Sequence, residues 1–204
     1  MPGPNFFAKL GLFVVEDFLD RQTCARIQTE MQAVTHSSAA VVDGSSKVER
    51  VKHASRRTGD ASVSATVSDL VQSQLRSLQP QLENHFHIQL SDCEKPQFLI
   101  YKPGDFFRPH RDGENDAAKP DYINRRRVSV VIFLNDPSEE HRPETYSGGS
   151  LTLYGVVNNP SWRNYGFQLT GMAGLLIAFR SELFHEVSEV LAGERYTVVS
   201  WFLS

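Results

Sequence analysis

The chain has 204 residues, of which 40% are hydrophobic and 22% charged, and its formal net charge is -3. These values are typical of a soluble globular protein with a sizeable core, and the small negative charge argues against nonspecific nucleic-acid binding. The two cysteines, Cys24 and Cys93, are too few for a disulfide framework or a thiolate zinc site. No secretory signal and no apolar run of membrane-spanning length is evident, so we expect a cytoplasmic protein without a membrane partner.

The first part of the chain predicts helices. Residues 12–15 indicate a short strand, and residues 24–34 carry apolar side chains at helical spacing. Apolar residues again repeat at three and four positions over residues 67–82, which predicts a second helix. Pro80 lies inside this pattern and should kink or end the helix.

A long polar segment separates the two predicted helices. Residues 37–60 are small, polar and locally basic, which fits a solvated loop. Long loops in compact domains are often active-site lids, so we predict a flexible flap here. Arg56 and Arg57, near the end of this segment, are candidates for binding an acidic group of a substrate.

From residue 97 onward, short apolar runs rich in β-branched and aromatic residues replace the helical period, and turn-forming residues separate them. Such runs predict strands. Helices followed by many strands indicate helices packed on a β-sandwich or barrel. Because no linker composition divides the chain, we predict one domain over residues 1–204. The predicted strands are Gln97–Tyr101, Val128–Leu134, Ser150–Tyr154, Leu175–Phe179 and Val198–Leu203.

Two potential metal ligands follow the first of these strands and a Pro103–Gly104 turn: His110 and Asp112. In an extended chain, side chains two residues apart point to the same face, so this imidazole and this carboxylate would converge. They would form two-thirds of the 2-His-1-carboxylate ligand set that suits non-haem Fe(II). On its own, a His-x-Asp pair favours a surface turn.

Two further residues follow later strands. His185 lies between apolar neighbours after the strand at 175–179, where a single histidine is commonly a core or turn residue. Arg195 opens the last strand, and a guanidinium at the mouth of a buried strand needs an anionic partner. No acidic run in the sequence is placed to meet it, whereas a small dicarboxylate would bind its fork bidentately.

Together, these residues resemble the 2-oxoglutarate- and Fe(II)-dependent dioxygenases, and among them the prolyl 4-hydroxylase-like branch. The resemblance covers residues 97–204, whereas residues 1–96 agree only in layout. The segments that carry it are Tyr101–Gly104, His110–Asp112, Arg127–Asn135, Gly148–Leu151, His185 and Arg195–Trp201.

The resemblance implies a mainly β fold with flanking helices (α+β). Residues 97–204 would form a double-stranded β-helix, a cupin-like jelly roll, as the catalytic core. Residues 1–96 would supply the helical support and the flap. The catalytic residues would be His110, Asp112 and His185, which would hold Fe(II) at the open end of the roll.

The resemblance also implies a co-substrate pocket. Arg195 would bind the distal carboxylate of 2-oxoglutarate, with Tyr101 and Thr197 beside it. The hypoxia-sensing prolyl hydroxylases carry a tyrosine where this chain has Phe133, so Tyr101 or Thr197 would have to supply that hydrogen bond. The collagen-type enzymes carry lysine where this chain has Arg195.

The implied reaction is a hydroxylation in which 2-oxoglutarate and O2 yield succinate, CO2 and a hydroxylated substrate, with ascorbate as a candidate reductant. Related halogenases lack the carboxylate at Asp112, so its presence favours hydroxylation. Peptidyl proline is the leading substrate, while a free amino acid, a small natural product or another protein side chain stays open. Leu151, Val187 and Trp201 would form apolar walls. The candidate substrate-binding residues are Arg56, Arg57, Arg126, Arg127 and Trp201.

Other function classes stay open at this point. A cupin-like metal-binding module would explain the three ligands but not Arg195. A zinc hydrolase is compatible with His and Asp ligands, although the sequence has no helical His-Glu-x-x-His. A peptide-binding module with degenerate chemistry is the third alternative, and the intact ligand set argues against it. The sequence does not define an oligomeric state.

Overall fold

The computed structural model describes residues 4–40, 50–52, 55–114, 120–140, 142, 144–157, 161 and 164–204. The helices are α1 (Pro4–Lys9), α2 (Arg21–Ala40), α3 (Ala65–Phe86) and α4 (Asp121–Arg125). The strands of the first half are β1 (Phe13–Val15), β2 (Arg50–Lys52), β3 (Arg56–Ala61), β4 (Asp92–Cys93), β5 (Gln97–Tyr101) and β6 (Phe106–His110). Those of the second half are β7 (Arg126–Phe133), β8 (Tyr146–Gly148), β9 (Leu151–Tyr154), β10 (Gly166–Leu169), β11 (Leu176–Arg180), β12 (His185–Val187), β13 (Val190–Gly193) and β14 (Arg195–Leu203).

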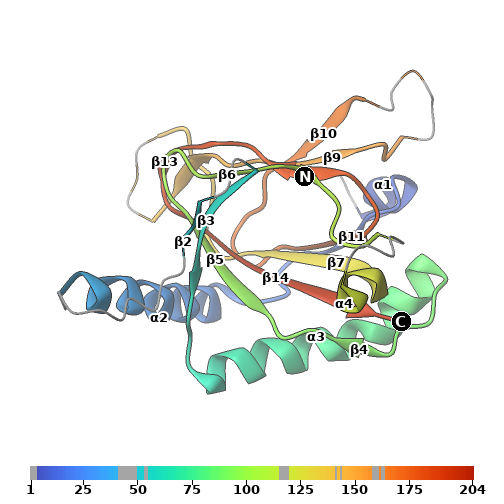
Figure 1. Cartoon of the computed structure of the whole chain (residues 1–204), viewed down its shortest axis with the longest axis horizontal. Helices are drawn as coiled ribbons and strands as arrows, with labels where there is room; N and C mark the ends of the chain where they lie inside the picture. The colour runs from blue at the N-terminus through green and yellow to red at the C-terminus, as the bar shows by residue number, and fades with distance from the viewer. Residues whose placement is uncertain are drawn as a thin grey trace.

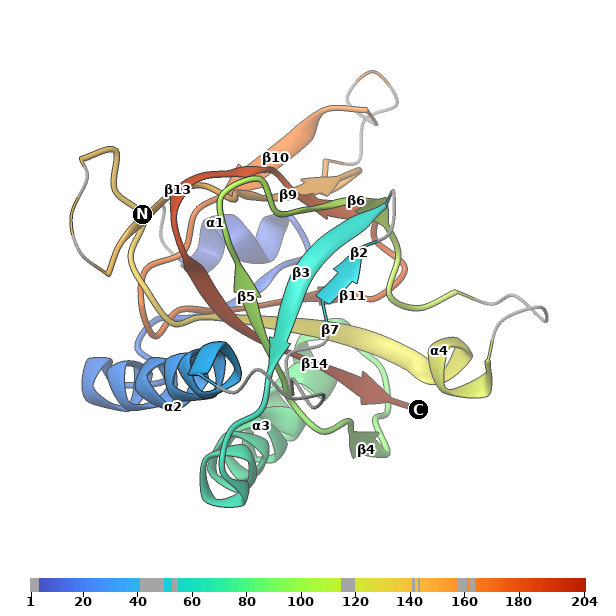
Figure 2. The same ribbon diagram turned by 60° about the vertical axis from the view of Figure 1, so that its left-hand side comes forward.

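The strands form one long, curled antiparallel sheet, in the order β1-β11-β7-β14-β5-β3-β6-β12-β9-β10. In addition, β2 pairs with β3, β4 pairs with β14, and a separate ladder joins β13 to β8. Figure 2 shows how the sheet curls, so that β6, β9 and β10 lie across from β7 and β14. The two halves of the curled sheet therefore face each other, and their inner faces enclose the interior.

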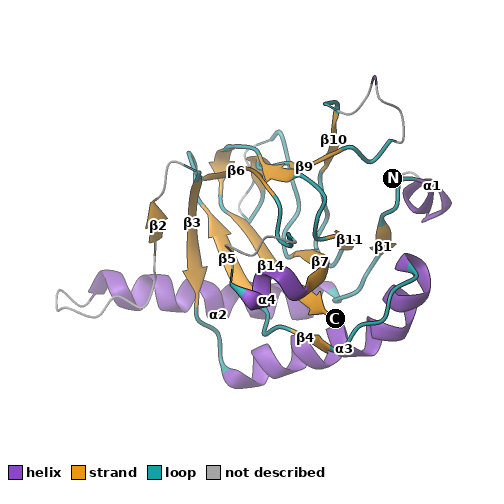
Figure 3. Ribbon diagram, turned by 45° about the vertical axis from the view of Figure 1, so that its right-hand side comes forward, coloured by secondary structure: helices purple, strands orange, loops and turns teal. Residues whose placement is uncertain are grey.

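Helices α2 and α3 cover the outer face of the β7–β14 half, as Figures 1 and 3 show. Val128, Val130 and Ile132 of β7 pack against these helices in one apolar cluster. The apolar repeat of α3 supplies its side of this cluster. Its buried residues are Val67, Val71, Leu75, Leu78, Leu82 and Phe86.

The alternate side chains of β7 point the other way. Val131 and Phe133 join Leu153, Ile177 and Phe179 in a second cluster between the two halves of the sheet. From Val128 to Phe133, β7 is buried on both faces, so this stretch is apolar apart from Ser129 and does not alternate with exposed polar residues. This is why its strand was predictable from composition alone.

Both predicted helices extend beyond their expected limits. Helix α2 continues to Ala40, and α3 runs through Pro80 to Phe86, so of the expected kink or end at Pro80 the end is wrong. Proline in a helix interior costs about 3 kcal/mol. Here Pro80 is exposed, and Leu78 and Leu82 on either side of it are buried in the core. Packing of this apolar face holds the helix together across the proline.

The interpretation of residues 37–60 as one flap is also corrected in part. Residues 37–40 belong to α2, and residues 56–60 belong to β3. Strand β3 pairs with both β5 and β6, and Thr58 within it is buried. These residues are thus part of the sheet. Residues 41–49 and 53–54 lie outside the described residues.

Cys24 and Cys93 are free, buried thiols. Burial raises the pKa of each to about 11, so neither is a reactive thiolate at neutral pH. Across the described part of the chain, no helix is long and apolar enough to cross a membrane.

Candidate active site

His110 and His185 face each other across neighbouring strands. Strands β6 and β12 pair antiparallel, with His185 opposite His110 and Val187 opposite Phe107. The register shifts between these two pairs, so β6 carries one extra residue. This β-bulge contains Pro109, which a regular inner strand would not accept. The bulge turns His110 to the side on which Phe107 also lies, and the two rings stack with centroids 3.5 Å apart.

Asp112 lies just beyond the end of β6, so the extended geometry expected for the His-x-Asp pair stops at His110. The backbone N–H groups of Asp112 and Gly113 both donate to the carbonyl of Ser181, each at 3.0 Å. A Cβ atom at Gly113 would lie 2.5 Å from the carbonyl oxygen of Arg126, so this close turn requires glycine. The turn nevertheless places the carboxylate oxygens of Asp112 3.5 Å from His110 Nε2 and 3.4 Å from His185 Nε2.

These three side chains fit a metal ion. Their ligand atoms all lie within 4.8 Å of one another. The Nδ1 atoms of His110 and His185 lie 2.8 Å from the carbonyl of Arg108 and 2.9 Å from that of Leu183. A carbonyl only accepts, so each Nδ1 carries a proton. Each Nε2 faces Asp112, and its lone pair is available to a metal when the ring is neutral. Two imidazoles and one carboxylate match the ligand set of non-haem Fe(II) oxygenases.

The electrostatics of the cluster keep Asp112 ionised. Burial would raise the pKa of Asp112, but the charge of His185 and hydrogen bonds from both histidines hold it well below its usual range. Burial lowers the pKa of His185, whereas the facing Asp112 raises it, and the net direction is upward. Asp112 is therefore a carboxylate at neutral pH, as a metal ligand must be.

Arg195 is the most unusual side chain of the pocket. It begins β14 opposite Tyr101 of β5 and is 1% exposed. Its Nη1 donates to Thr197 Oγ1 at 3.4 Å, whereas its Nε and Nη2 have no partner. The guanidinium carbon lies 5.2 Å from the ring centroid of Tyr101 and 5.0 Å from that of Phe133. Leaving a buried guanidinium uncompensated costs several kcal/mol, so this environment suits an anion.

A single pocket contains both Arg195 and the cluster of potential metal ligands (called the metal cluster below), although they lie on different strands. The three potential ligands, Arg195, Tyr101 and Thr197 all line it. The three expected apolar wall residues line it as well: Leu151, Val187 and Trp201. The structure thus brings together every predicted metal and co-substrate residue. Their individual roles stay predictions.

The two arginines of β7, which were candidates for substrate binding, do not fit that role. The Nε and Nη2 of Arg126 donate to the carboxylate of Glu94 at 2.6 and 2.7 Å, and its guanidinium carbon lies 3.7 Å from the ring centroid of Trp201. Arg127 is exposed and donates to the backbone carbonyl of Asn124 at 2.6 Å. Neither arginine lines the pocket. Arg126 is better placed to hold Trp201 than to bind an acidic substrate.

Arg56 and Arg57 separate because successive side chains of β3 point to opposite faces. Arg56 lines the pocket, with its guanidinium carbon 4.9 Å from the Phe107 ring centroid and its Nη2 3.7 Å from Asp60. Its buried Nε has no partner. Arg57 is exposed, and its Nη1 lies 3.5 Å from the carbonyl of Gly104. Of the two, Arg56 is the one that reaches the site.

Sequence analysis missed Glu94 and Phe107. No local pattern marks Glu94, because its partner Arg126 is distant along the chain. Phe107 had a local signal, since it is an aromatic residue shortly before a candidate ligand. In a regular strand, Phe107 and His110 would point to opposite faces. The bulge, which the sequence does not reveal, brings them to the same face.

Comparison with known proteins agrees with this geometry. The model of the 2OG-Fe(II) oxygenase superfamily matches residues 96–203. A PKHD-type hydroxylase of Shewanella baltica is 32% identical over 110 residues, which are 53% of this chain and 42% of that protein. Another, from Thermosynechococcus vestitus, is 33% identical over 107 residues, covering 52% of this chain and 42% of its own. The matches thus span less than half the length of these relatives.

Solved structures show the same fold. A prolyl-4-hydroxylase of Pseudomonas putida has a TM-score of 0.71 at 21% identity, covering 95% of this chain and 92% of its own. A prolyl hydroxylase of Trichoplax adhaerens, solved with a hypoxia-inducible-factor peptide, has a TM-score of 0.67 at 18% identity, covering 98% and 86%. The predicted double-stranded β-helix is confirmed. Since the family match covers more than half of the chain and contains the whole cluster and Arg195, the chain belongs to the 2OG-Fe(II) oxygenase superfamily.

Proposed function

We propose that this protein is an Fe(II)- and 2-oxoglutarate-dependent dioxygenase of the prolyl 4-hydroxylase type. It would hydroxylate peptidyl proline or a related amino-acid side chain and release succinate and CO2. The observation that carries the proposal is the buried Arg195, whose Nε and Nη2 are unpaired in the same pocket as the metal cluster. Neither a cupin-like metal-binding module nor a zinc hydrolase requires such a residue.

Each part of the pocket then has a role. Fe(II), when bound, would supply the centre at which O2 and the 2-oxo acid react. His110, Asp112 and His185 would hold it from one side, and Arg195 would bind the distal carboxylate of 2-oxoglutarate. The charges of Fe(II) and Arg195 would balance those of Asp112 and the two co-substrate carboxylates. The filled pocket would therefore bury no net charge from these groups, whereas the empty one leaves Arg195 uncompensated.

Tyr101 and Thr197 are able to donate hydrogen bonds in this pocket. Burial raises the pKa of the Tyr101 phenol, although the charge of Arg195 opposes this. The phenol thus keeps its proton at neutral pH. The Thr197 hydroxyl accepts from Arg195, so its own proton is available for a carboxylate. Both residues support the co-substrate role predicted for them.

The pocket lining supports a prolyl substrate. Phe107 and Trp201 both line it, and aromatic faces suit the apolar ring of proline. Trp201 is 8% exposed, and its Nε1 has no partner, so this N–H could donate to a peptide carbonyl. The Arg126–Glu94 pair would hold the indole in place. The unpaired Nε of Arg56 favours the alternative of a free amino acid or a small natural product that carries a carboxylate.

The proposed catalytic unit is one domain across residues 1–204. Helices α2 and α3 pack on the sheet that carries β7 and β14, which supports a single cooperative unit. A cytoplasmic location and the use of ascorbate stay predictions.

The test begins with anaerobic titration of the Fe(II) protein with 2-oxoglutarate, followed by its visible absorption. We expect the spectrum to change, because the co-substrate joins the metal site. Proline-containing peptides and free amino acids are then tested by mass spectrometry for gain of one oxygen atom, dependent on iron and 2-oxoglutarate. A protein that binds iron but never responds to 2-oxoglutarate would be a metal-binding module instead. Hydrolysis supported by Zn(II) alone would favour the zinc hydrolase.

A further inference from the structure

A second buried polar group without a partner lies close to Arg195. Tyr146, the first residue of β8, is 2% exposed, and within the described residues its hydroxyl proton has no hydrogen-bond acceptor. An unsatisfied buried hydroxyl costs about 1–3 kcal/mol. Native proteins leave few such groups, so this one needs an explanation.

The backbone is built to bring Tyr146 to this place. Strand β8 pairs with β13, with Tyr146 opposite Gly193, two residues before Arg195. A Cβ atom at Gly193 would lie 2.1 Å from the carbonyl oxygen of Thr145, and one at Gly149 would lie 2.8 Å from Arg195 Cδ. Both glycines have positive φ, at +70° and +61°. The two glycines thus allow β8 to approach both β13 and the side chain of Arg195.

The chemistry of the pair requires an acceptor. Burial raises the pKa of the Tyr146 phenol, and the nearby charge of Arg195 only partly opposes this, so the phenol stays protonated. A guanidinium only donates hydrogen bonds. Even a bond from Arg195 to the Tyr146 oxygen would therefore leave the phenol proton without an acceptor. The Nε and Nη2 of Arg195 and the hydroxyl of Tyr146 form a cluster of buried donors.

We propose that Tyr146 is a co-substrate-binding residue whose hydroxyl donates to the distal carboxylate of 2-oxoglutarate beside Arg195. The proposal rests on the proposed function and adds a donor from a strand that sequence analysis did not identify. Phe133 lies 5.0 Å from the Arg195 guanidinium carbon and offers no hydrogen bond. A carboxylate between Arg195 and Tyr146 would satisfy the unpaired donors on both residues.

The variant Tyr146→Phe tests this, because it removes only the hydroxyl. We expect about tenfold weaker binding of 2-oxoglutarate, measured anaerobically by calorimetry on the Mn(II)-loaded protein. The thermal stability of the protein without co-substrate should stay equal or rise, since the change removes an unsatisfied buried group. A purely structural tyrosine would give the opposite pair of results.

A shorter ligand shows which carboxylate Tyr146 contacts. 2-Oxobutyrate keeps the 2-oxo acid group but lacks the distal carboxylate. Tyr146→Phe should weaken 2-oxoglutarate and leave the affinity for 2-oxobutyrate unchanged. Equal weakening of both ligands would overturn the proposal, because the effect would then not act through the distal carboxylate.

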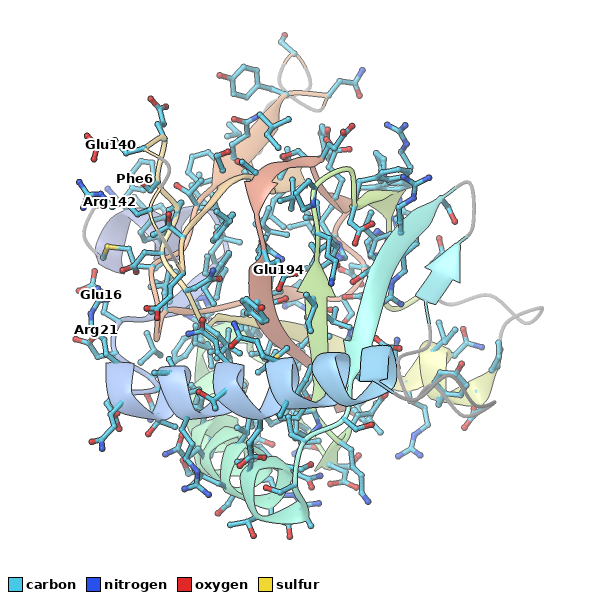
Figure 4. The ribbon with its side chains drawn as sticks, turned by 90° about the vertical axis from the view of Figure 1, so that its left-hand side faces the viewer. Phe6, Glu16, Arg21, Glu140, Arg142 and Glu194 are labelled. Carbon is cyan, nitrogen blue, oxygen red and sulfur yellow. The ribbon has the colours of Figure 1, made fainter. Side chains whose placement is uncertain are left out.

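Tyr196→Phe is the matched control. Tyr196 is also buried and directly follows Arg195, but its hydroxyl bonds to Glu194 and accepts from Gln32 of α2 at 3.1 Å. Figure 4 shows Glu194 beside β14, on the side of the barrel above α2. This variant should lose stability and keep the wild-type affinity for 2-oxoglutarate.

The outcomes separate this proposal from the proposed function. If Arg195→Ala weakens 2-oxoglutarate binding and Tyr146→Phe does not, the role of Tyr146 is wrong and the proposed function stands. If the wild-type protein with metal binds no 2-oxoglutarate, the proposed function itself fails, and the role of Tyr146 fails with it.

Discussion

Arg126 and Arg195 are both largely buried, yet they differ in whether their guanidinium groups have partners within the protein. Arg126 donates two hydrogen bonds to Glu94 and stacks on Trp201. Arg195 has two nitrogen atoms without any partner. A buried cation is stable only when something compensates it. We therefore infer that the charge of Arg126 is compensated within the fold, by Glu94, whereas that of Arg195 is compensated by a bound ligand.

The largest effect should come from the metal cluster, which lies in the same pocket as Arg195. His110→Ala and His185→Ala should each abolish metal-dependent turnover, because each removes one of three protein ligands. The fold should survive, since the two main apolar clusters contain neither histidine. Iron content, hydroxylation and circular dichroism measure the three effects. Wild-type iron content and rate in either variant would contradict the assignment.

The second-largest effect is expected at Arg195, the arginine with unpaired nitrogen atoms. Arg195→Ala should weaken 2-oxoglutarate binding by about 3–5 kcal/mol, more than about a hundredfold, because the distal carboxylate loses its charged partner. Iron binding should be spared. Arg195→Lys should be milder, since it keeps the charge. Calorimetry with 2-oxoglutarate and separately with iron measures both, and an unchanged co-substrate affinity in Arg195→Ala would remove the main support for the proposed function.

The third effect is expected at Arg126, the arginine that is paired with Glu94. Glu94→Ala would leave Arg126 uncompensated and should destabilise the protein by about 1–3 kcal/mol. The affinity for 2-oxoglutarate should not change, because this pair contacts Trp201 and not Arg195. Denaturant unfolding and calorimetry are the measurements, with the double variant Glu94→Leu, Arg126→Met as control. The double variant should recover stability, and a loss of co-substrate affinity in Glu94→Ala would argue against separate roles.

The same contrast explains what sequence could predict of the site. His110, His185 and Arg195 were identifiable because each follows or opens an apolar run that is unambiguous in the sequence. Glu94 and Tyr146 were not, because their significance depends on partners brought close by strand pairing and close glycine contacts. Whether a hydroxyl lacks a hydrogen-bond partner, or two charged residues form an ion pair, depends on the fold and leaves no pattern in the nearby sequence.

The strands divide in the same way. Strands β7 and β14 are buried on both faces and were predicted from their apolar runs. Strand β3, with the sequence RRTGDA, has no apolar run and was assigned to the flap. It is a strand because β5 and β6 supply hydrogen-bonding partners on its two sides. Nonlocal pairing thus decided where composition favoured a loop.

The smallest predicted effect concerns Arg56 and Arg57, which are adjacent in sequence but lie on opposite faces of β3. Arg56→Ala should raise the KM for the substrate about fivefold, roughly 1 kcal/mol, because a partly exposed guanidinium contributes modestly to binding. Arg57→Ala is the matched control and should leave KM unchanged, since Arg57 is exposed outside the pocket. Neither change should alter the affinity for 2-oxoglutarate, for which Arg195 is the proposed binding residue elsewhere in the pocket.

Substrate chemistry sharpens this last test. If Arg56 binds a carboxylate, its loss should weaken a substrate with a free carboxyl group near the target residue and spare the matching amide. If it binds a peptide carbonyl instead, acid and amide should weaken equally. An equal change in KM from Arg56→Ala and Arg57→Ala would show that the alternation of β3 does not govern substrate binding. Arg56 would then have no role in substrate binding that Arg57 does not share.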